Sequence, residues 1–197
     1  MISGVKVRAS IALLLALAAI PASAAAPLTV TELMQMLGSV ESARARFVET
    51  RESTLLKTPL VLQGTLSYRR PDRVEKHVLS PHDERITVEG GKLTLENRSQ
   101  NRRKTISVGS APGLAALVES IRATRAGDLV ALRRHYALQI EGSRGEWTLT
   151  LTPLDSQVGD YVTSVVLSGS DSRIGRITVV ETGGDRSIME ITEDRTP

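Results

Sequence analysis

Residues 62–78, LQGTLSYRRPDRVEKHV, contain the clearest strand pattern in the chain, followed by a turn and a second, more charged stretch. Leu62, Leu66 and Tyr68 stand two or four residues apart with polar residues between them, which predicts a strand with one apolar face. Strand parity carries Arg70 onto the same face. The sequence therefore predicts an apolar row that ends in an arginine on the inside of a sheet.

The same two-residue period recurs in segments 43–47 and 147–152 and in the C-terminal part of the chain. Segment 86–96, ITVEGGKLTLE, predicts a hairpin that turns on Gly90 and Gly91, because glycine tolerates the positive φ that such turns need. Short strands at this spacing, separated by turn residues, are typical of an antiparallel sheet or barrel. A large sheet of this kind curls to bury one of its faces.

Helical patterns interrupt the strands in two places. Residues 31–40 predict an N-terminal helix capped by Thr31. An insertion at about residues 110–135 predicts a helix that begins at Ser110 and ends at Gly127, and a shorter one after it. The longer helix has an apolar stripe at positions i, i+3, i+4 and i+7, namely Leu114, Leu117, Val118 and Ile121. Because such a stripe must cover something, we expect these helices to lie over the open or concave face of the sheet, above an apolar cavity.

The N-terminus has a short basic start, an apolar run over residues 11–20 and then small residues. This pattern predicts a secretory signal peptide over residues 1–24, cleaved among Ala24–Ala26. The apolar run is shorter than the roughly 20 residues that cross a bilayer. The chain has no cysteine for a lipid anchor or a disulfide. We therefore expect an exported periplasmic monomer with a single domain over residues 27–197.

The charge of the chain does not favour a nucleic-acid partner. The formal net charge is +3, and the predicted signal peptide removes Lys6 and Arg8 and no acids, so about +1 remains. Aromatic residues make up 3% of the chain, whereas a platform that stacks single-stranded bases needs more. We expect no nucleic-acid partner.

Catalytic motifs do not stand out in the sequence. His77, His82 and His135 are not spaced as metal ligands, and no nucleophile elbow or glycine-rich phosphate loop occurs. Asp72 and Glu75 are acidic neighbours of a kind that is common in a chain with 24% charged residues. We expect a protein that is not an enzyme and needs no metal and no cofactor.

A basic cluster, Arg102, Arg103 and Lys104, follows the predicted hairpin. One interpretation is a solvated loop or a sheet edge whose charges discourage strand pairing. The other is a docking patch for an acidic partner.

Several stretches together resemble the periplasmic outer-membrane lipoprotein carrier family, LolA. ARARFVET at 43–50 resembles a family strand that ends in Phe-x-Gln, with Glu49 in place of the glutamine. GTLSYRRPDRVEK at 64–76 resembles a stretch with a glycine, an aromatic residue and an Arg-Pro pair. ERITVEGGKLTLEN at 84–97, the helical insertion and the C-terminal strands follow in the family's order.

The resemblance implies a half-open antiparallel β-barrel with an N-terminal helix and a helical lid. It also implies a cavity for the acyl chains of lipoproteins, an inner-membrane release complex that loads the carrier and an outer-membrane receptor that empties it. In the family the arginine before the proline holds the lid, which makes Arg70 the expected latch here, with lid backbone carbonyls of 114–121 or 129–136 as acceptors. The alternative is a turn residue whose guanidinium stays in water. The expected cavity residues are Phe47, Leu62, Leu66, Tyr68, Trp147, Leu149 and Leu151, and the expected lid residues are the apolar stripe of the longer helix.

Some features depart from the family. The chain has one Trp and one Phe, Glu49 replaces the usual glutamine, and the C-terminal strands stop early. These departures favour a divergent member whose cargo is a lipoprotein or another acylated or polyene-like lipid. Two further readings stay open, namely a sensor or interaction domain of the same fold that regulates an envelope process, and an enzyme.

Overall fold

One antiparallel sheet of 11 strands runs through the part of the chain that the computed structural model describes, residues 26–108, 112–154 and 156–194. The side chains of 112–118 and 157 fall outside this description. The strands are β1 Ser42–Glu52, β2 Leu60–Arg69, β3 Arg73–Ser80, β4 Glu84–Glu89, β5 Lys92–Asn97, β6 Arg102–Ser107, β7 Tyr136–Ser143, β8 Glu146–Pro153, β9 Val162–Ser170, β10 Arg173–Glu181 and β11 Arg186–Glu193. The helices are α1 Val30–Gly38, α2 Pro112–Ala126, α3 Leu129–His135 and the single turn α4 Ser156–Gly159.

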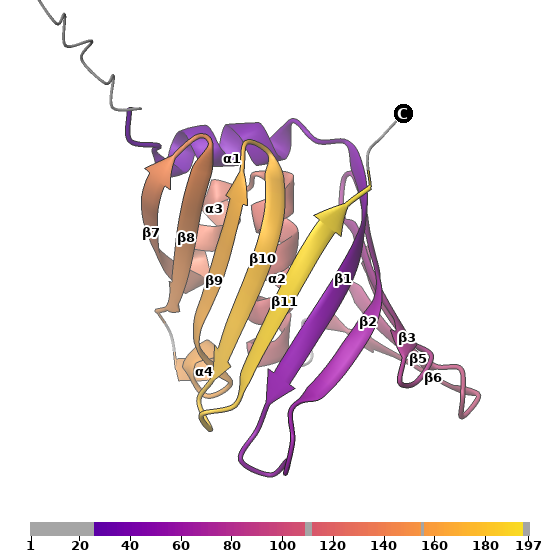
Figure 1. Ribbon diagram of the computed structural model, residues 1–197. Helices are drawn as coiled ribbons and strands as arrows, with labels where there is room; N and C mark the ends of the chain where they lie inside the picture. The colour runs from indigo at the N-terminus through magenta and orange to yellow at the C-terminus, as the bar shows by residue number, and fades with distance from the viewer. Residues whose placement is uncertain (1–25, 109–111, 155, 195–197) are drawn as a thin grey trace, which may run out of the picture.

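The strand order is β6-β5-β4-β3-β2-β1-β11-β10-β9-β8-β7, so β6 and β7 form the two edges and the sheet is not closed. Strand β1 pairs with both β2 and β11, and this pairing joins the N-terminal and the C-terminal strands. The sheet curves around α2 and α3, and α1 lies across one end of it (Figure 1). The expected architecture, an open antiparallel sheet with helices on its concave side, is confirmed.

The N-terminal helix begins one residue earlier than expected, and its cap lies two residues earlier. Thr29 is its N-cap: its hydroxyl accepts a hydrogen bond from the backbone N–H of Glu32, 3.2 Å away, and the Glu32 carboxylate accepts from the Thr29 N–H at 2.9 Å. This reciprocal arrangement is a capping box, whose Thr-x-x-Glu spacing is visible in the sequence. The assignment of the cap to Thr31 is wrong for this reason.

The turn residues behave as the sequence predicts. Gly90 and Gly91 have φ values of 57° and 68° at the β4–β5 hairpin, and Gly127 ends α2 with a φ of 70°. Asp128 caps α3, where its carboxylate accepts from the Ala131 N–H at 3.0 Å. Ser110, the expected start of the longer helix, lies outside the described residues.

The main core lies between the β7–β10 half of the sheet and the helices. Trp147, Leu149 and Leu151 of β8 are almost fully buried there, together with Leu33 of α1 and Leu132 of α3. A smaller cluster lies in the other half of the sheet, where Phe47, Leu62 and Val78 of β1, β2 and β3 pack together. Between these two clusters lies the middle of the concave face.

Within the described residues, none of the helices is both long enough and apolar enough to cross a membrane.

The junction of α2 with α1 depends on a close backbone approach at Gly127. A Cβ at this position would collide with the carbonyl oxygen of Met34 and lie 2.8 Å from the Cα of Gly38. A side chain would also occupy the left-handed region, which costs about 1–2 kcal/mol for an L-residue.

We predict that Gly127→Ala lowers the free energy of unfolding by at least about 1 kcal/mol, because of the positive φ and the collision with α1. Urea unfolding followed by circular dichroism measures the change. The matched control is Gly145→Ala, where an added Cβ meets no atom within 4 Å. Equal stability of the two variants would contradict the importance of this junction.

Candidate functional site

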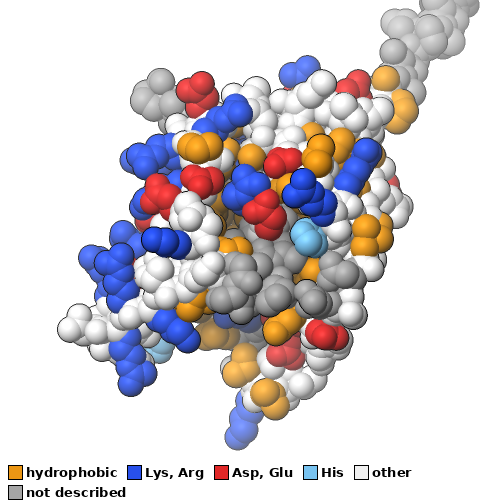
Figure 2. All heavy atoms as spheres, turned by 180° about the vertical axis from the view of Figure 1, so that it is seen from behind, with side chains coloured by type: hydrophobic (Ala, Val, Ile, Leu, Met, Phe, Trp, Pro, Cys, Tyr) orange, Lys and Arg blue, Asp and Glu red, His pale blue; other side chains and the backbone are white. Residues whose placement is uncertain are grey.

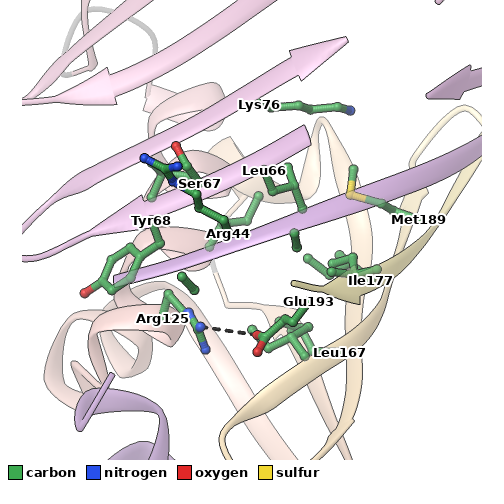
Figure 3. Close-up of a pocket in the computed structure, with 16 residues that line it drawn as sticks. Arg44, Leu66, Ser67, Tyr68, Lys76, Arg125, Leu167, Ile177, Met189 and Glu193 are labelled. Carbon is green, nitrogen blue, oxygen red and sulfur yellow. Dashed lines mark hydrogen bonds and ion pairs between the residues drawn. The ribbon is translucent and has the colours of Figure 1, made fainter. Parts of the chain in front are cut away.

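A cavity of about 150 Å³ lies between α2 and the middle of the concave sheet face. Strands from both halves of the sheet form its walls, with β1, β2 and β3 on one side and β9, β10 and β11 on the other, and α2 covers it. Its lining is mainly apolar and is supplied by Ala43, Ala45, Leu66, Tyr68, Val74, Ile121, Leu167, Ile174, Ile177, Met189 and Ile191 (Figure 3). The charged residues at its margin are Arg44, Lys76, Arg125 and Glu193.

The structure places some of the expected cavity residues here and others elsewhere. Leu66 and Tyr68 line the cavity, and so does Ile121 of the expected lid stripe. Phe47 and Leu62 belong to the neighbouring apolar cluster. The side chains of Leu114, Leu117 and Val118 lie outside the described residues.

The assignment of Trp147, Leu149 and Leu151 to the cavity is wrong. They have the correct parity, because they point to the concave side, but β8 lies next to the edge strand β7, where the helices fill the space. These side chains are the centre of the packed core.

Several cavity residues that the sequence pattern did not predict lie on the last two strands, β10 and β11. Met189 and Ile191 alternate with Glu190 and Thr192 along β11, a pattern that was readable in the sequence. Ile174 and Ile177 of β10 stand three residues apart, yet both line the cavity, because the pairing of β10 with β9 shifts its register between Ile174 and Arg176. No alternation rule predicts such a bulge.

Arg70 does not occupy the predicted position. Its side chain is exposed and its Nη1 donates to the carbonyl oxygen of Gly38, the last residue of α1, at 2.7 Å. Strand β2 ends at Arg69, so strand parity no longer holds at Arg70. The arginine thus joins a turn to α1, and within the described part of the chain its guanidinium bonds to Gly38 and not to the helical insertion.

The buried arginine of the site is Arg125, in the last turn of α2, which is 7% exposed. Its Nη1 donates to the carbonyl oxygen of Ser172 at 2.9 Å, and its Nη2 lies 3.3 Å from a carboxylate oxygen of Glu193. The guanidinium also lies 5.6 Å from the ring centre of Tyr68. Burial lowers the pKa of Arg125, and the nearby carboxylate of Glu193 offsets part of that effect.

The sequence contains a signal for this arginine. Arg125 follows Leu114, Leu117, Val118 and Ile121 at the next helical step of four residues, so it continues their stripe. A charge that follows an apolar row therefore does connect a helix to the sheet, but the row is on α2 and not on β2. Figure 3 shows the ion pair of Arg125 with Glu193 at one end of the cavity.

A second group of charges lies on the concave face beyond the other end of the cavity. Glu49 of β1 is 2% exposed, and its carboxylate forms an ion pair with the ammonium of Lys76 of β3. The same carboxylate accepts from Arg51 Nε at 2.8 Å and from the Ser187 hydroxyl at 2.7 Å. Lys76 also lies 5.1 Å from the ring centre of Phe47.

This environment shifts both pKa values. Burial by itself would raise the pKa of Glu49, but Lys76, Ser187 and Arg51 outweigh it, and the pKa lies below its ordinary value of 4.5. Burial lowers the pKa of Lys76 below its ordinary value of 10.5, and the attraction of Glu49 opposes this shift only in part. The amine of Lys76 therefore has little water around it and depends on Glu49 to keep its proton.

The remaining candidates have local roles or stand at the edge of the sheet. His77 bonds to Asp83 at 2.8 Å, and the described residues contain no group of three or more His, Cys, Asp or Glu that could hold a metal ion. Arg102, Arg103 and Lys104 are exposed on the edge strand β6, where Arg103 pairs with Glu96 of β5 at 3.3 Å. Figure 2 shows the helical side of the molecule, with basic side chains gathered toward the strands at the right of Figure 1.

We predict that Glu49 contributes to the acid sensitivity of the fold. Because its pKa is lower in the folded chain than in the unfolded chain, its stabilising contribution is complete above about pH 4.5 and is lost as the pH falls through the folded-state value. Glu49→Gln should therefore flatten the decrease of the free energy of unfolding between neutral and acidic pH, measured by urea unfolding at several pH values. An equal flattening by Glu52→Gln, an exposed position at the end of the same strand, would contradict this assignment.

Comparisons with known proteins relate the chain to one family. The family model described as outer membrane lipoprotein carrier protein LolA-like matches residues 22–190, whereas no curated protein matches the chain. Similar solved structures include a LolA superfamily protein from Nitrosomonas europaea, at 12% identity and a TM-score of 0.46 over 86% of this chain and 96% of that one. Another is a putative outer membrane lipoprotein-sorting protein domain from Vibrio parahaemolyticus, at 10% identity and a TM-score of 0.49 over 85% and 92% of the two chains. A third is the MucA/MucB complex of Pseudomonas aeruginosa, at 14% identity and a TM-score of 0.44 over 85% and 58%. Because the family model covers most of the chain, the protein belongs to the LolA-like family.

Proposed function

We propose that this protein is a periplasmic carrier that shields the acyl chains of lipoproteins, or another apolar lipid, and delivers them toward the outer membrane. The observation that carries the proposal is the apolar cavity beneath α2, in the middle of a concave sheet face. Membership in the LolA-like family supports the same function. An acyl chain exposed to water costs about 25 cal/mol for each Å² of its surface, so it needs such a cover to leave a membrane.

The cavity is small for the proposed cargo. A cavity of about 150 Å³ is comparable to an engineered apolar cavity that admits benzene. A lipid acyl chain is much larger than benzene. We infer that α2, the lid helix, moves away from the sheet when cargo enters.

Arg125 is well placed to govern this movement. It connects the lid helix to the turn between β9 and β10 and to the end of β11 through its contacts with Ser172 and Glu193. The junction at Gly127 follows it directly and holds the end of the lid helix against α1. A lid with two positions, one held by this ion pair and one stabilised by cargo, allows both shielding and release.

The partners proposed for this function are an inner-membrane release complex as donor and an outer-membrane receptor as acceptor. A sensor or interaction domain is the alternative, and it would depend on a docking surface such as Arg102, Arg103 and Lys104. The edge position of β6 gives these charges a sufficient role in preventing strand pairing. The cavity therefore supports the carrier more strongly than the basic cluster supports the sensor.

We predict that filling the cavity removes its lipid. Ala45 is 5% exposed and lines the cavity, so Ala45→Phe should decrease the lipid that is retained after native purification by about tenfold, equivalent to ~1.4 kcal/mol of binding free energy. Mass spectrometry of extracted lipid measures the change. Ala137→Phe, on an exposed position of β7, is the control. If natively purified wild-type protein retains no lipid, the carrier proposal is wrong.

We predict that Arg125→Met loosens the lid. The variant loses the hydrogen bonds of a charged group, each of which contributes about 1.5–3 kcal/mol to stability. It should therefore bind an apolar fluorescent dye more rapidly than the wild type does. The control is Arg122→Met, because Arg122 lies on the same helix but pairs with Glu119 and Asp128 and not with the sheet. The same rate of dye uptake in both variants would exclude a specific role of Arg125 in closure.

A further inference from the structure

The pair formed by Glu49 and Lys76 lies next to the cavity, and the hydrogen bonds of Glu49 to described residues stay within the sheet. Lys76 lines the cavity, and its side chain extends past Leu66 and Met189, on the side away from Arg125 (Figure 3). Along β1, Ala45 pairs with Glu193 and Glu49 pairs with Met189. Glu49 is thus four residues along β1 from the residue beside Glu193, the partner of Arg125. This separation is about 13 Å at ~3.3 Å per residue.

The hydrogen bonds of this pair are distributed unequally. The carboxylate of Glu49 accepts from three donors, namely Lys76, Arg51 and Ser187. An ammonium group has three N–H donors. Among the described residues, the Lys76 ammonium donates a hydrogen bond to Glu49 alone. The Lys76 side chain is 16% exposed, so water can satisfy its other donors only in part. The carboxylate is therefore well satisfied and the ammonium is not.

The local charge is also unbalanced. Arg51 and Lys76 supply two positive charges and Glu49 supplies one negative charge, so the group carries one net positive charge on a mainly apolar face. An anion beside Lys76 would neutralise it. Glu49 would keep Arg51 and Ser187 as donors if the ammonium turned toward such an anion.

We infer that Lys76 is the anchor for the anionic head group of a single-chain amphiphile whose tail occupies the cavity under the lid helix. This inference rests on the proposed function and makes the ligand class more specific. A carboxylate and a phosphate share the required chemistry, because both accept several charge-assisted hydrogen bonds. Glu49 accepts the hydrogen bond of the ammonium when no ligand is bound. The head group replaces Glu49 as the acceptor when the ligand binds.

The test is competition against a neutral apolar fluorescent dye bound to the full chain at neutral pH. The competitors are dodecanoate, dodecyl phosphate and uncharged 1-dodecanol, which share one tail. Wild-type protein should bind at least one of the anions about tenfold more tightly than the alcohol, which corresponds to ~1.4 kcal/mol. The anion that binds more tightly identifies the head group.

Variants separate the anchor from the cavity. Lys76→Met should lose the preference for the anions and still bind the alcohol, whereas Lys57→Met, at an exposed lysine, should keep the preference. Glu49→Gln frees the ammonium and should increase the preference, and it provides a second readout if Lys76→Met fails to fold.

The outcomes distinguish this inference from the proposed function. Equal binding of the anions and the alcohol by the wild type, or an unchanged preference in Lys76→Met, would overturn the anchor and leave the carrier intact. Failure of all three competitors and of the dye to bind would overturn both.

Discussion

The pairing of β1 with β11 is the constraint on which the rest of the structure depends. It joins strands that are about 140 residues apart in the sequence, Ala45 beside Glu193 and Glu49 beside Met189. Without it, the N-terminal and C-terminal strands would form two separate sheets with apolar faces too small to enclose a cavity. With it, β1 becomes the centre of one continuous concave face, and both the cavity and its charged ends lie along this strand.

The two ion pairs on this face, Arg125 with Glu193 and Lys76 with Glu49, connect different elements of the structure. Arg125 on the lid helix reaches across to a backbone carbonyl and to Glu193, so its pairing connects two elements that can separate. Lys76 and Glu49 belong to strands of one sheet, two strands apart, so their pairing lies within the sheet. Buried pairs add little net stability, because desolvation offsets their attraction. In the proposed function, both pairs are therefore better explained by control of the cavity than by stability.

In the proposed function the protein must bind its cargo and later release it, and the small cavity under α2 suits this requirement. An apolar tail gains free energy from burial only after the lid helix has left the sheet, and the loss of the Arg125 contacts offsets part of that gain. The binding energy is thus divided between holding cargo and opening the lid. A larger preformed cavity would bind more tightly and release more slowly.

Local features of this fold were readable from the residues themselves. The glycine turn at Gly90 and Gly91, the end of α2 at Gly127 and the cap at Asp128 depend on the conformations of single residues, and so they were predicted correctly. The alternation along β1, β2 and β8 likewise reported which side chains face the concave side. It could not report which part of that side is packed and which part is hollow, since this depends on where the helices lie.

The sequence by itself determined an open antiparallel sheet, its turns and the position of α2 in the chain. Tertiary structure alone decided that Trp147 packs in the core while Leu66 faces a cavity, because β8 lies beneath several helices and β2 lies near the centre of the sheet. It also decided which arginine is buried. Strand β2 ends before Arg70 and leaves it in a turn, whereas α2 continues through Arg125 and carries its charge down to Glu193, a residue that becomes its neighbour only when the chain folds.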